Sequence, residues 1–241
     1  MTDTTSEKKS VFSLPIKKNS LILAIFAIAC TAMVGIVNEL TKNKIKEQAQ
    51  LQLLNTLHSI IEPNRYNNKI TQDCIDLNVV SANSAAINEN VSQLAYVARI
   101  DSKPVAIAIT NTAPDGYSGN IDLIIAINID ESISGVRVLS HSETPGLGDK
   151  VEFRKSDWIT SFTGKKLLSE QDTRWAVTKD GGIFDQFTGA TITPRAVVKA
   201  IKKTLLYFKK NKSTIFSLPN ACSISNEKIS NTIKSEAKNE Q

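Results

Sequence analysis

The stretch DQFTGATITPRAVVKAIKKTLLYF, residues 185–208, places a turn of small residues directly ahead of an apolar helix. Thr193 carries the kind of hydroxyl that caps helix starts, and Pro194 suits the first helical position. Apolar residues then recur on one face, with lysines opposite them, at Val197, Val198, Ile201, Leu205 and Phe208. We expect a helix from Pro194 to about Lys210 that closes the domain.

Thr191 lies just ahead of this predicted helix start, at a position that suits a phosphate group. Unpaired backbone N–H groups and the positive end of the helix dipole favour an anion there. Gly189 and Ala190 leave space for a bulky group against the backbone. An ordinary capped helix preceded by a Thr-Gly turn would give the same short pattern, so the pattern alone does not establish a site.

Upstream of this helix, strand-like runs rich in Val, Ile and Ala are separated by Gly, Asn, Asp or Pro. The runs are Gln93 to Ile100, Pro104 to Thr110, Ile121 to Asn128 and Gly135 to His141. They predict an antiparallel sheet backed by helices, and therefore an α+β fold. We expect Trp158 to Phe162 to form a short helix or an edge segment after the sheet.

The segment HSETPGLGD, residues 141–149, follows directly from the last predicted strand. Pro145 and Gly146 fit the central pair of a type II turn, whose second residue is left-handed. The segment is either a tight connection between elements or a loop over a ligand. Gly146 and Gly148 do not form a Rossmann fingerprint, because the third glycine and a following helix signal are missing. Nicotinamide binding is therefore disfavoured.

The N-terminal region contains an uncharged apolar segment between Asn19 and Asn38. Twenty helical residues at about 1.5 Å each span roughly 30 Å, the thickness of the hydrocarbon core of a bilayer. A buried core helix is rarely apolar on every face, and a signal peptide has a shorter apolar region. We predict a retained transmembrane helix over residues 20–38, preceded by a tail over residues 1–19.

The lysines that flank this segment give a small orientation bias. Four precede it and three follow it closely: Lys8, Lys9, Lys17, Lys18, Lys42, Lys44 and Lys46. This bias favours a cytoplasmic N-terminus and a domain on the far side of the membrane. Because the lysines of the chain are spread out without interleaved aromatic residues, the net charge of +5 does not indicate nucleic-acid binding.

Beyond the predicted span, the sequence divides into three parts. Residues 39–62 read as an amphipathic juxtamembrane helix, whose apolar face could pack on the domain or on a partner subunit. Residues 63–222 are long enough for one globular domain. Residues 223–241 are rich in Ser, Asn, Lys and Glu, and we expect them to form a mobile polar tail.

The chain contains three cysteines, of which Cys30 falls in the predicted span. No C-x-x-C or four-cysteine pattern occurs, so iron–sulfur, haem and structural zinc sites are disfavoured. If the domain lies outside the cytoplasm, Cys74 and Cys222 could form a disulfide that joins its two ends, or they could stay unpaired.

The tetrapeptide Thr188-Gly189-Ala190-Thr191 resembles the S/T-G-A-T flavinylation motif of the FMN-carrying subunits of Rnf and Na+-NQR complexes. The resemblance implies that FMN is esterified through its phosphate to Thr191, with Thr188, Gly189 and Ala190 beside the cofactor. It also implies that Asp185, the acidic residue ahead of the motif, helps a flavin transferase to recognise it.

The pattern H-x-E-T-P-G-L-G at residues 141–148 is similar to a second block of this family, in which the loop lines the isoalloxazine ring. This implies that Glu143, Thr144 and Leu147 contact the flavin. Four further segments look like the FMN-carrying G-type proteins of Rnf complexes, namely Arg65 to Asn68, Ala113 to Gly119, Ser156 to Ile159 and Lys179 to Gly182. The C-type protein of Na+-NQR shares the motif and the anchor and is the alternative.

Membership of the Rnf family implies an electron-transfer subunit of an ion-translocating oxidoreductase rather than a stand-alone catalyst. Electrons flow between ferredoxin and NAD in such complexes, and in enteric relatives the complex keeps a redox-sensing regulator reduced. The implied partners are the other subunits, a flavin transferase and the lipid bilayer. The implied location is the inner membrane, crossed once, with the domain in the periplasm.

Two readings compete with the flavin carrier. One is a membrane-anchored sensory module that binds a phosphate-containing ligand noncovalently, in which Thr191 contributes only a hydrogen bond. The other is a structural assembly subunit without a chromophore. Neither accounts for the joint presence of the Thr-Gly-Ala-Thr turn, a helix start and the loop at residues 141–148 behind an anchor.

Overall fold

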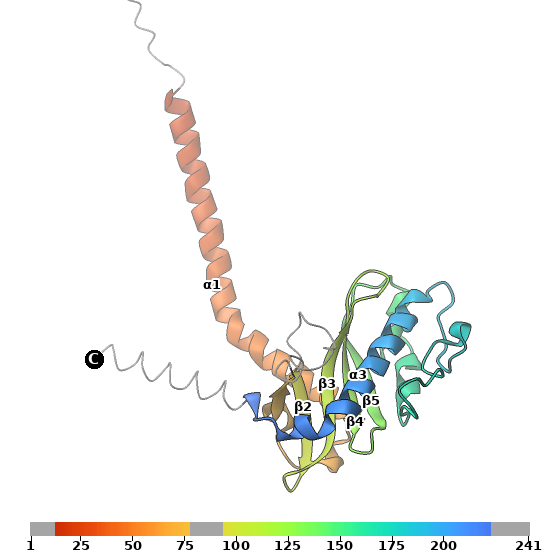
Figure 1. Cartoon of the computed structure of the whole chain (residues 1–241). Helices are drawn as coiled ribbons and strands as arrows, with labels where there is room; N and C mark the ends of the chain where they lie inside the picture. The colour runs from red at the N-terminus through yellow and green to blue at the C-terminus, as the bar shows by residue number, and fades with distance from the viewer. Residues whose placement is uncertain (1–12, 78–93, 223–241) are drawn as a thin grey trace, which may run out of the picture. The chain divides into compact units, whose positions relative to one another are not determined.

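The computed structural model describes residues 13–77 and 94–222 (Figure 1). The helices are α1 (Ser13–Ile60) and α3 (Ile192–Ser217), and the strands are β1 (Cys74–Asp76), β2 (Leu94–Ile100), β3 (Lys103–Ala113), β4 (Ile121–Asn128) and β5 (Ile133–Ser140). Short 3-10 helices are η1 (Pro63–Arg65), η2 (Ile70–Gln72), η3 (Gly148–Val151), η4 (Asp157–Phe162) and η5 (Thr178–Asp180). The chain divides after Leu51 into two compact units.

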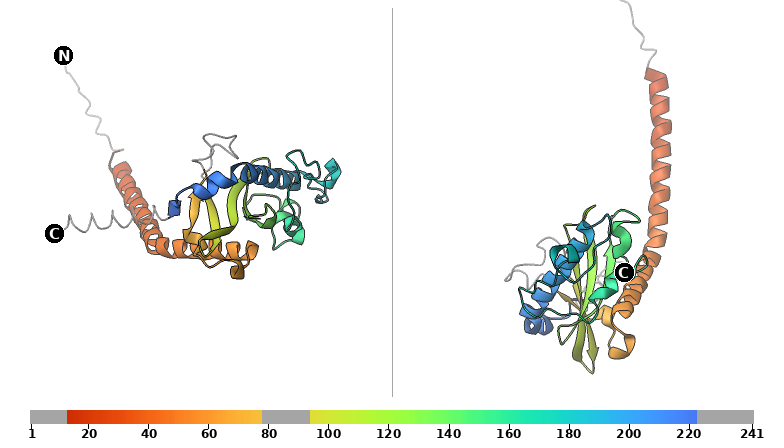
Figure 2. Two further views of the ribbon diagram at one scale, coloured as in Figure 1. Left: turned by 60° about the horizontal axis from the view of Figure 1, so that its bottom comes forward. Right: turned by 90° about the vertical axis from the view of Figure 1, so that its right-hand side faces the viewer.

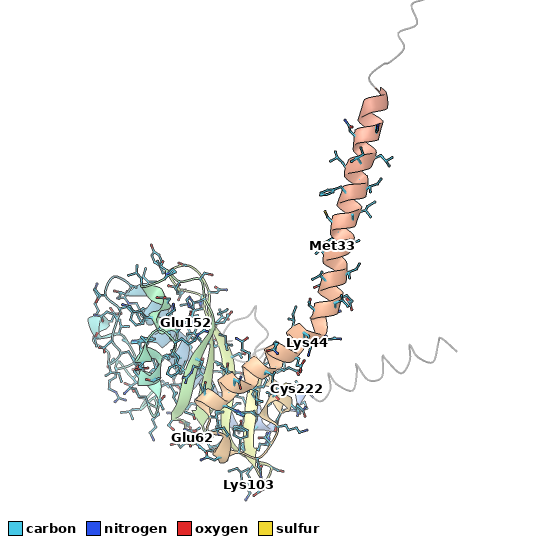
Figure 3. The ribbon with its side chains drawn as sticks, turned by 180° about the vertical axis from the view of Figure 1, so that it is seen from behind. Met33, Lys44, Glu62, Lys103, Glu152 and Cys222 are labelled. Carbon is cyan, nitrogen blue, oxygen red and sulfur yellow. A yellow bond between two sulfur atoms is a disulfide. The ribbon has the colours of Figure 1, made fainter. Side chains whose placement is uncertain are left out.

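The first unit contains most of α1. Within the described residues, α1 is the one helix long and apolar enough to cross a membrane. Its apolar side chains are exposed all round, as the labelled Met33 illustrates (Figure 3). The predicted span and the predicted juxtamembrane helix are joined in this single helix, which ends at Ile60.

The second unit is built on a five-stranded antiparallel sheet with the order β1-β2-β3-β4-β5. Four of these strands match the predicted runs, apart from Gln93, which lies outside the described residues, and shifts of one to three residues at several ends. The three-residue strand β1 was not predicted, because it is too short to show an alternating pattern. The α+β fold expected from the sequence is confirmed.

Both faces of the sheet are covered by helices. Figure 2 shows α3 on one face and the last turns of α1 on the other. The face toward α3 is lined by large aliphatic side chains, including Val97, Ile107, Ile109, Leu123, Ile125 and Ile127. Each such side chain contributes about 1.5–3 kcal/mol when it is fully buried. This face therefore holds most of the apolar core.

The opposite face is lined largely by short side chains, at Ala98, Ala106, Ala108 and Ala126. Leu57 and Ile60, from the last turns of α1, pack there. Gly135 in β5 allows the close approach, because a Cβ atom at this position would lie 2.9 Å from the Cα atom of Ile60. The apolar face of the end of α1 thus packs on its own domain, which the sequence left open.

The two ends of the domain meet at the edge of the sheet. The sulfur atoms of Cys74 in β1 and Cys222 are bonded, with Cα atoms 5.4 Å apart. Between them, Asn220 accepts hydrogen bonds from the backbone N–H groups of Cys74 and Cys222, at 3.4 and 2.9 Å. Chain segments 148 residues apart in the sequence are therefore fastened together.

The helix α3 differs from its prediction at both ends. It begins at Ile192 rather than Pro194, with Thr191 at the N-cap position, so the assignment of Thr193 as N-cap was wrong. It ends at Ser217 rather than near Lys210, because Ile215 continues the buried stripe. Trp158 to Phe162 fall in η4, so the short-helix alternative is correct for this segment.

Candidate functional site

Two loops meet at the N-terminal end of α3 and enclose a hollow. One loop follows β5 and the other is the turn of small residues ahead of Thr191. The hollow has a volume of about 280 Å³ and is lined by Tyr117, Glu143, Thr144, Leu147, Gly148, Gly189, Ala190, Thr191, Ile192 and Thr193. Residues that are far apart in the sequence therefore form one site.

Six of the residues predicted to contact a cofactor line this hollow together: Glu143, Thr144, Leu147, Gly189, Ala190 and Thr191. Thr188 does not line it. Thr188 instead lines a second, more open hollow on the other side of the turn, together with Thr191 and Lys179. Asp185 is exposed and lines neither hollow.

The turn that carries Thr191 has a tightly defined backbone. Gly189 has a φ of +80°, a left-handed conformation that side-chain-bearing residues adopt at a cost. The backbone N–H of Ala190 donates to the carbonyl of Phe187 at 3.1 Å and closes the turn. Thr191 itself is half-buried, and its hydroxyl makes no capping hydrogen bond to the helix. This hydroxyl is therefore available on the wall of the hollow.

Thr193 has a different environment from Thr191. It is completely buried, and its hydroxyl donates to the Oε2 atom of Glu143. The expected N-cap role fails because this hydroxyl pairs with a carboxylate across the site instead of with a backbone N–H group of its own helix.

Glu143 is also buried, with an exposed fraction of 4%. Its Oε1 atom accepts from the backbone N–H of Ser118 at 2.9 Å. Its own backbone N–H donates to Nδ1 of His141 at 3.0 Å, and Nε2 of His141 lies 2.8 Å from Oε1 of Glu152. Glu152, labelled in Figure 3, lies near one end of the sheet, and Lys103 marks the other end.

An ion pair supports the first turn of α3 from outside. Two guanidinium nitrogens of Arg195 each lie 2.6 Å from a carboxylate oxygen of Asp180, in η5. These hydrogen bonds hold the pKa of Asp180 below its ordinary value. Gly181 follows in a left-handed conformation with a φ of +83°, which turns the chain back toward the site.

The two tryptophans lie outside the lining of the hollow. Trp175 is buried against Phe162 and Phe184 in the core. Trp158 is half-buried, and its indole N–H donates to the carbonyl of Asp185 at 2.7 Å. Its ring packs edge-on against Phe187, with centroids 5.1 Å apart. Trp158 therefore braces the segment that leads to Thr191.

Three residues that line the hollow were not assigned a role from the sequence: Tyr117, Gly148 and Ile192. Tyr117 and Ile192 are large and exposed, at 67% and 47%. Tyr117 follows a Pro-Asp-Gly turn between two predicted strands, and an aromatic residue at a turn was the one available signal. Nothing in the local pattern indicates that this turn faces the start of α3.

Comparison with known protein families gives two matches. Residues 116–206 match the FMN-binding domain family. Residues 9–60 match the RnfG N-terminal region. The first match contains every residue that lines the hollow, and the second covers most of α1.

Whole-length relatives agree with these matches, and they are RnfG proteins of ion-translocating oxidoreductase complexes. The relative from Shewanella oneidensis is 51% identical over 208 residues, which cover 86% of this chain and 96% of the relative. Those from Vibrio atlanticus and Erwinia tasmaniensis are each 48% identical, over 86% and 88% of this chain and 97% and 98% of the relatives. The chain therefore belongs to the RnfG family of ion-translocating oxidoreductase complexes, electron-transfer subunits with an FMN-binding domain.

Proposed function

We propose that this subunit carries FMN covalently, through a phosphoester bond to the hydroxyl of Thr191, and serves as a relay of electrons within the complex. The observation that carries the proposal is the position of Thr191. Its hydroxyl is free of capping bonds, and it lies on the wall of the hollow opposite the loop at residues 141–148. The other threonine of this wall, Thr193, is already paired with Glu143.

The helix start supports a phosphate at Thr191. The first N–H groups of an α-helix have no intrahelical partner, and the dipole adds partial positive charge there. Gly189, without a side chain, leaves the backbone accessible next to Thr191. A phosphoester at this position would be held by backbone groups and would need no dedicated cation.

The lining of the hollow fits part of a flavin. Leu147, Ala190 and Ile192 supply apolar surface, and Tyr117 supplies an exposed aromatic ring at the rim. A volume of about 280 Å³ lies at the lower end for sites that enclose a drug-sized ligand. The residues present would therefore hold the cofactor and leave part of it open to an electron-transfer partner.

FMN supplies one-electron and two-electron chemistry when it is bound. The tasks of this chain are to hold the group, orient it and shape its electrostatic surroundings. A covalent bond prevents loss of the cofactor, and the anchor α1 keeps the domain close to its partners. A short tether of this kind raises the effective concentration to about the millimolar range.

We propose the inner membrane as the location, with residues 1–19 in the cytoplasm, a single span over residues 20–38 and the domain over residues 63–222 in the periplasm. The disulfide between Cys74 and Cys222 supports this orientation, because disulfides persist in oxidising compartments. The polar tail proposed for residues 223–241 lies outside the described residues.

In the proposed role, electrons pass between ferredoxin and NAD through the complex and drive ion movement. The maintenance of a reduced redox-sensing regulator is a second physiological role of the same complex. A flavin transferase that recognises Asp185 would attach the cofactor. The exposure of Asp185 and of the turn at residues 188–190 supports access by such an enzyme.

The test is the ultraviolet fluorescence of the denatured full-length chain on a gel, after expression with a flavin transferase. Wild type should give a fluorescent band, and Thr191→Val should remove it. Thr188→Val is the matched control, since it removes a hydroxyl from the same turn and should stay fluorescent. A dark wild-type band from cells with proven transferase activity would exclude the covalent carrier and favour a noncovalent binding module.

A further inference from the structure

We propose that Glu143 is a positioning residue, whose carboxylate fixes the first turn of α3 and thereby the acceptor hydroxyl of Thr191. This inference rests on the proposed attachment of FMN to Thr191. It reassigns Glu143, which the sequence pattern predicts to be a contact of the flavin. The carboxylate of Glu143 binds the protein itself.

The contacts of Glu143 carry this assignment. Its Oε1 atom accepts from the backbone N–H of Ser118 at 2.9 Å, and its Oε2 atom accepts from the hydroxyl of Thr193. Both carboxylate oxygens therefore hold protein donors. The two donors lie 25 and 50 residues away in the sequence. One carboxylate thus joins three chain segments at the edge of the hollow.

The space around the carboxylate is closed by glycines. A Cβ atom at Gly148 would lie 2.7 Å from Oε2 of Glu143 and 2.8 Å from Oγ1 of Thr193. A Cβ atom at Gly116 would lie 2.9 Å from Oε1 of Glu143. The backbone therefore comes as close to this carboxylate as its atoms allow. Hydrogen bonds to a buried carboxylate are strong, and a partner left unsatisfied there is costly.

The backbone of Glu143 is fixed as well. Its N–H donates to Nδ1 of His141, so that ring nitrogen is the acceptor and Nε2 carries the proton that points to Glu152. His141 is held between these two groups. The loop that presents the carboxylate is therefore oriented before any cofactor is attached.

Thr193 transmits this order to the acceptor residue. It lies two residues after Thr191, in the same first turn of α3, and is completely buried. The pair with Glu143 holds this turn from inside, while Asp180 holds Arg195 from outside. The rate of a transfer reaction is sensitive to placement, and an error of about 1 Å can cost about 100-fold. The pair should therefore matter for attachment more than for global stability.

The experiment compares two variants of the full-length chain that each remove one buried hydroxyl from α3. Thr193→Val breaks the pair with Glu143. Thr204→Val is the matched control, because Thr204 is also completely buried and hydrogen-bonded, to Ala200 and Asn111, but lies away from the site. Thr193→Ser restores the hydroxyl. The initial rate of flavinylation is measured with purified transferase, and kcat and KM are separated.

We expect Thr193→Val to lower kcat for flavinylation about tenfold or more, consistent with the cost of misplacing a reacting group. Thr204→Val should stay close to wild type, and Thr193→Ser should recover most of the rate. Unchanged kinetics in Thr193→Val would overturn the proposal. Equal losses in the two valine variants would also overturn it, since they would reflect general destabilisation.

A second readout needs no flavin. Hydrogen exchange of the unlabelled protein reports the backbone N–H of Ser118, which donates to Glu143. We expect its protection to fall in Thr193→Val and in Glu143→Gln, and to stay unchanged in Thr204→Val. If Thr193→Val does not fold, Glu143→Gln takes its place in the kinetic test. Unchanged exchange and kinetics in that variant would contradict the assignment.

The two readouts separate this proposal from the proposed function. If the wild-type chain is never flavinylated, the attachment to Thr191 is wrong, and the exchange data still decide whether Glu143 orders the first turn of α3. If the wild type is flavinylated and the exchange of Ser118 does not respond to Thr193→Val, the attachment stands and the role of Glu143 is wrong.

Discussion

The sheet and the region between β5 and α3 are stabilised in different ways. The sheet is held by continuous backbone ladders and by fully buried aliphatic side chains such as Ile107 and Ile125. The residues from 141 to 191 form only short 3-10 helices, η3, η4 and η5. Individual polar pairs hold this region, and examples are Asp172 with Arg174 and His141 with Glu152.

This difference separates stability from function. Apolar burial in the sheet is distributed over many residues and determines whether the domain folds. Each polar pair in the loop region fixes one local position, and the site at Thr191 depends on several such positions. Substitutions in the sheet should therefore lower the free energy of unfolding, whereas substitutions among the loops should change the site at a smaller cost in stability.

The largest expected effect is the loss of a side chain in the sheet. Ile125 in β4 is fully buried, so Ile125→Ala should reduce the free energy of unfolding by about 2–5 kcal/mol. Ile100→Ala at the end of β2 is the matched control, because Ile100 is 39% exposed. Thermal unfolding of the full-length protein measures both. Equal small losses would show that burial in the sheet is not what stabilises the domain.

The disulfide at the sheet edge should have the next largest effect. Replacement of both Cys74 and Cys222 by alanine should cost about 2–4 kcal/mol, because the bond constrains the unfolded chain. Cys30→Ala, which removes the free cysteine of α1, should have no comparable effect. The check is thermal unfolding with and without reductant. A wild-type melting temperature that ignores reductant would argue against this contribution.

Asp172 tests the loop region through pH. It is buried, and its carboxylate accepts from the guanidinium of Arg174 at 2.8 and 3.0 Å and from the backbone N–H of Leu168 at 3.1 Å. The hydrogen bonds from Arg174 hold the pKa of Asp172 well below its ordinary value. Since the folded-state pKa lies below the unfolded one, the stabilisation is complete above about pH 4 and is lost as the pH falls further.

Asp172→Asn should therefore lower the melting temperature at pH 7 by about 2–6 °C, and the difference from wild type should narrow below about pH 4. Glu170→Gln is the control from the same loop, because Glu170 forms only an exposed ion pair with Lys210. Melting curves across the pH range measure both variants. A difference that widens as the pH falls would contradict the assigned direction of the pKa shift.

The smallest expected effect on stability is at Asp185, which is exposed and contacts Trp158 through its backbone carbonyl alone. Asp185→Ala should change the free energy of unfolding by less than about 0.5 kcal/mol. It should nevertheless reduce flavinylation severalfold if a transferase recognises this carboxylate. Asp157→Ala, at another exposed aspartate, is the control. Undiminished labelling would remove Asp185 from the recognition site.

Much of the sheet could be predicted because its signals are local. Runs of β-branched residues bounded by turn residues give β2, β3, β4 and β5 to within a few residues. The strand β1 has only three residues and pairs with β2 across a long stretch of sequence, so no local pattern marks it. The end of α3 was misjudged because the buried Ile215 lies beyond a run of polar residues.

The site could be predicted only in part, for a related reason. The turn at residues 188–191 and the loop at residues 141–148 show their own turn chemistry, and the structure brings them together. The pairing of Glu143 with Thr193 depends on the packing of three separate segments, and a hydroxyl near a helix start is equally suited to capping. Sequence patterns therefore identified the neighbourhood of the site but not which side chains bind each other.

The central claim is that Thr191, and no other residue, carries the flavin. Cleavage after Lys179 and Arg195 by trypsin releases one peptide, residues 180–195, that contains Thr188, Thr191 and Thr193. Tandem mass spectrometry of this peptide, from protein expressed with an active flavin transferase, assigns the modification to one residue. We expect the flavin phosphate on Thr191 alone. Its presence on Thr188 or Thr193, or an unmodified peptide, would contradict the account.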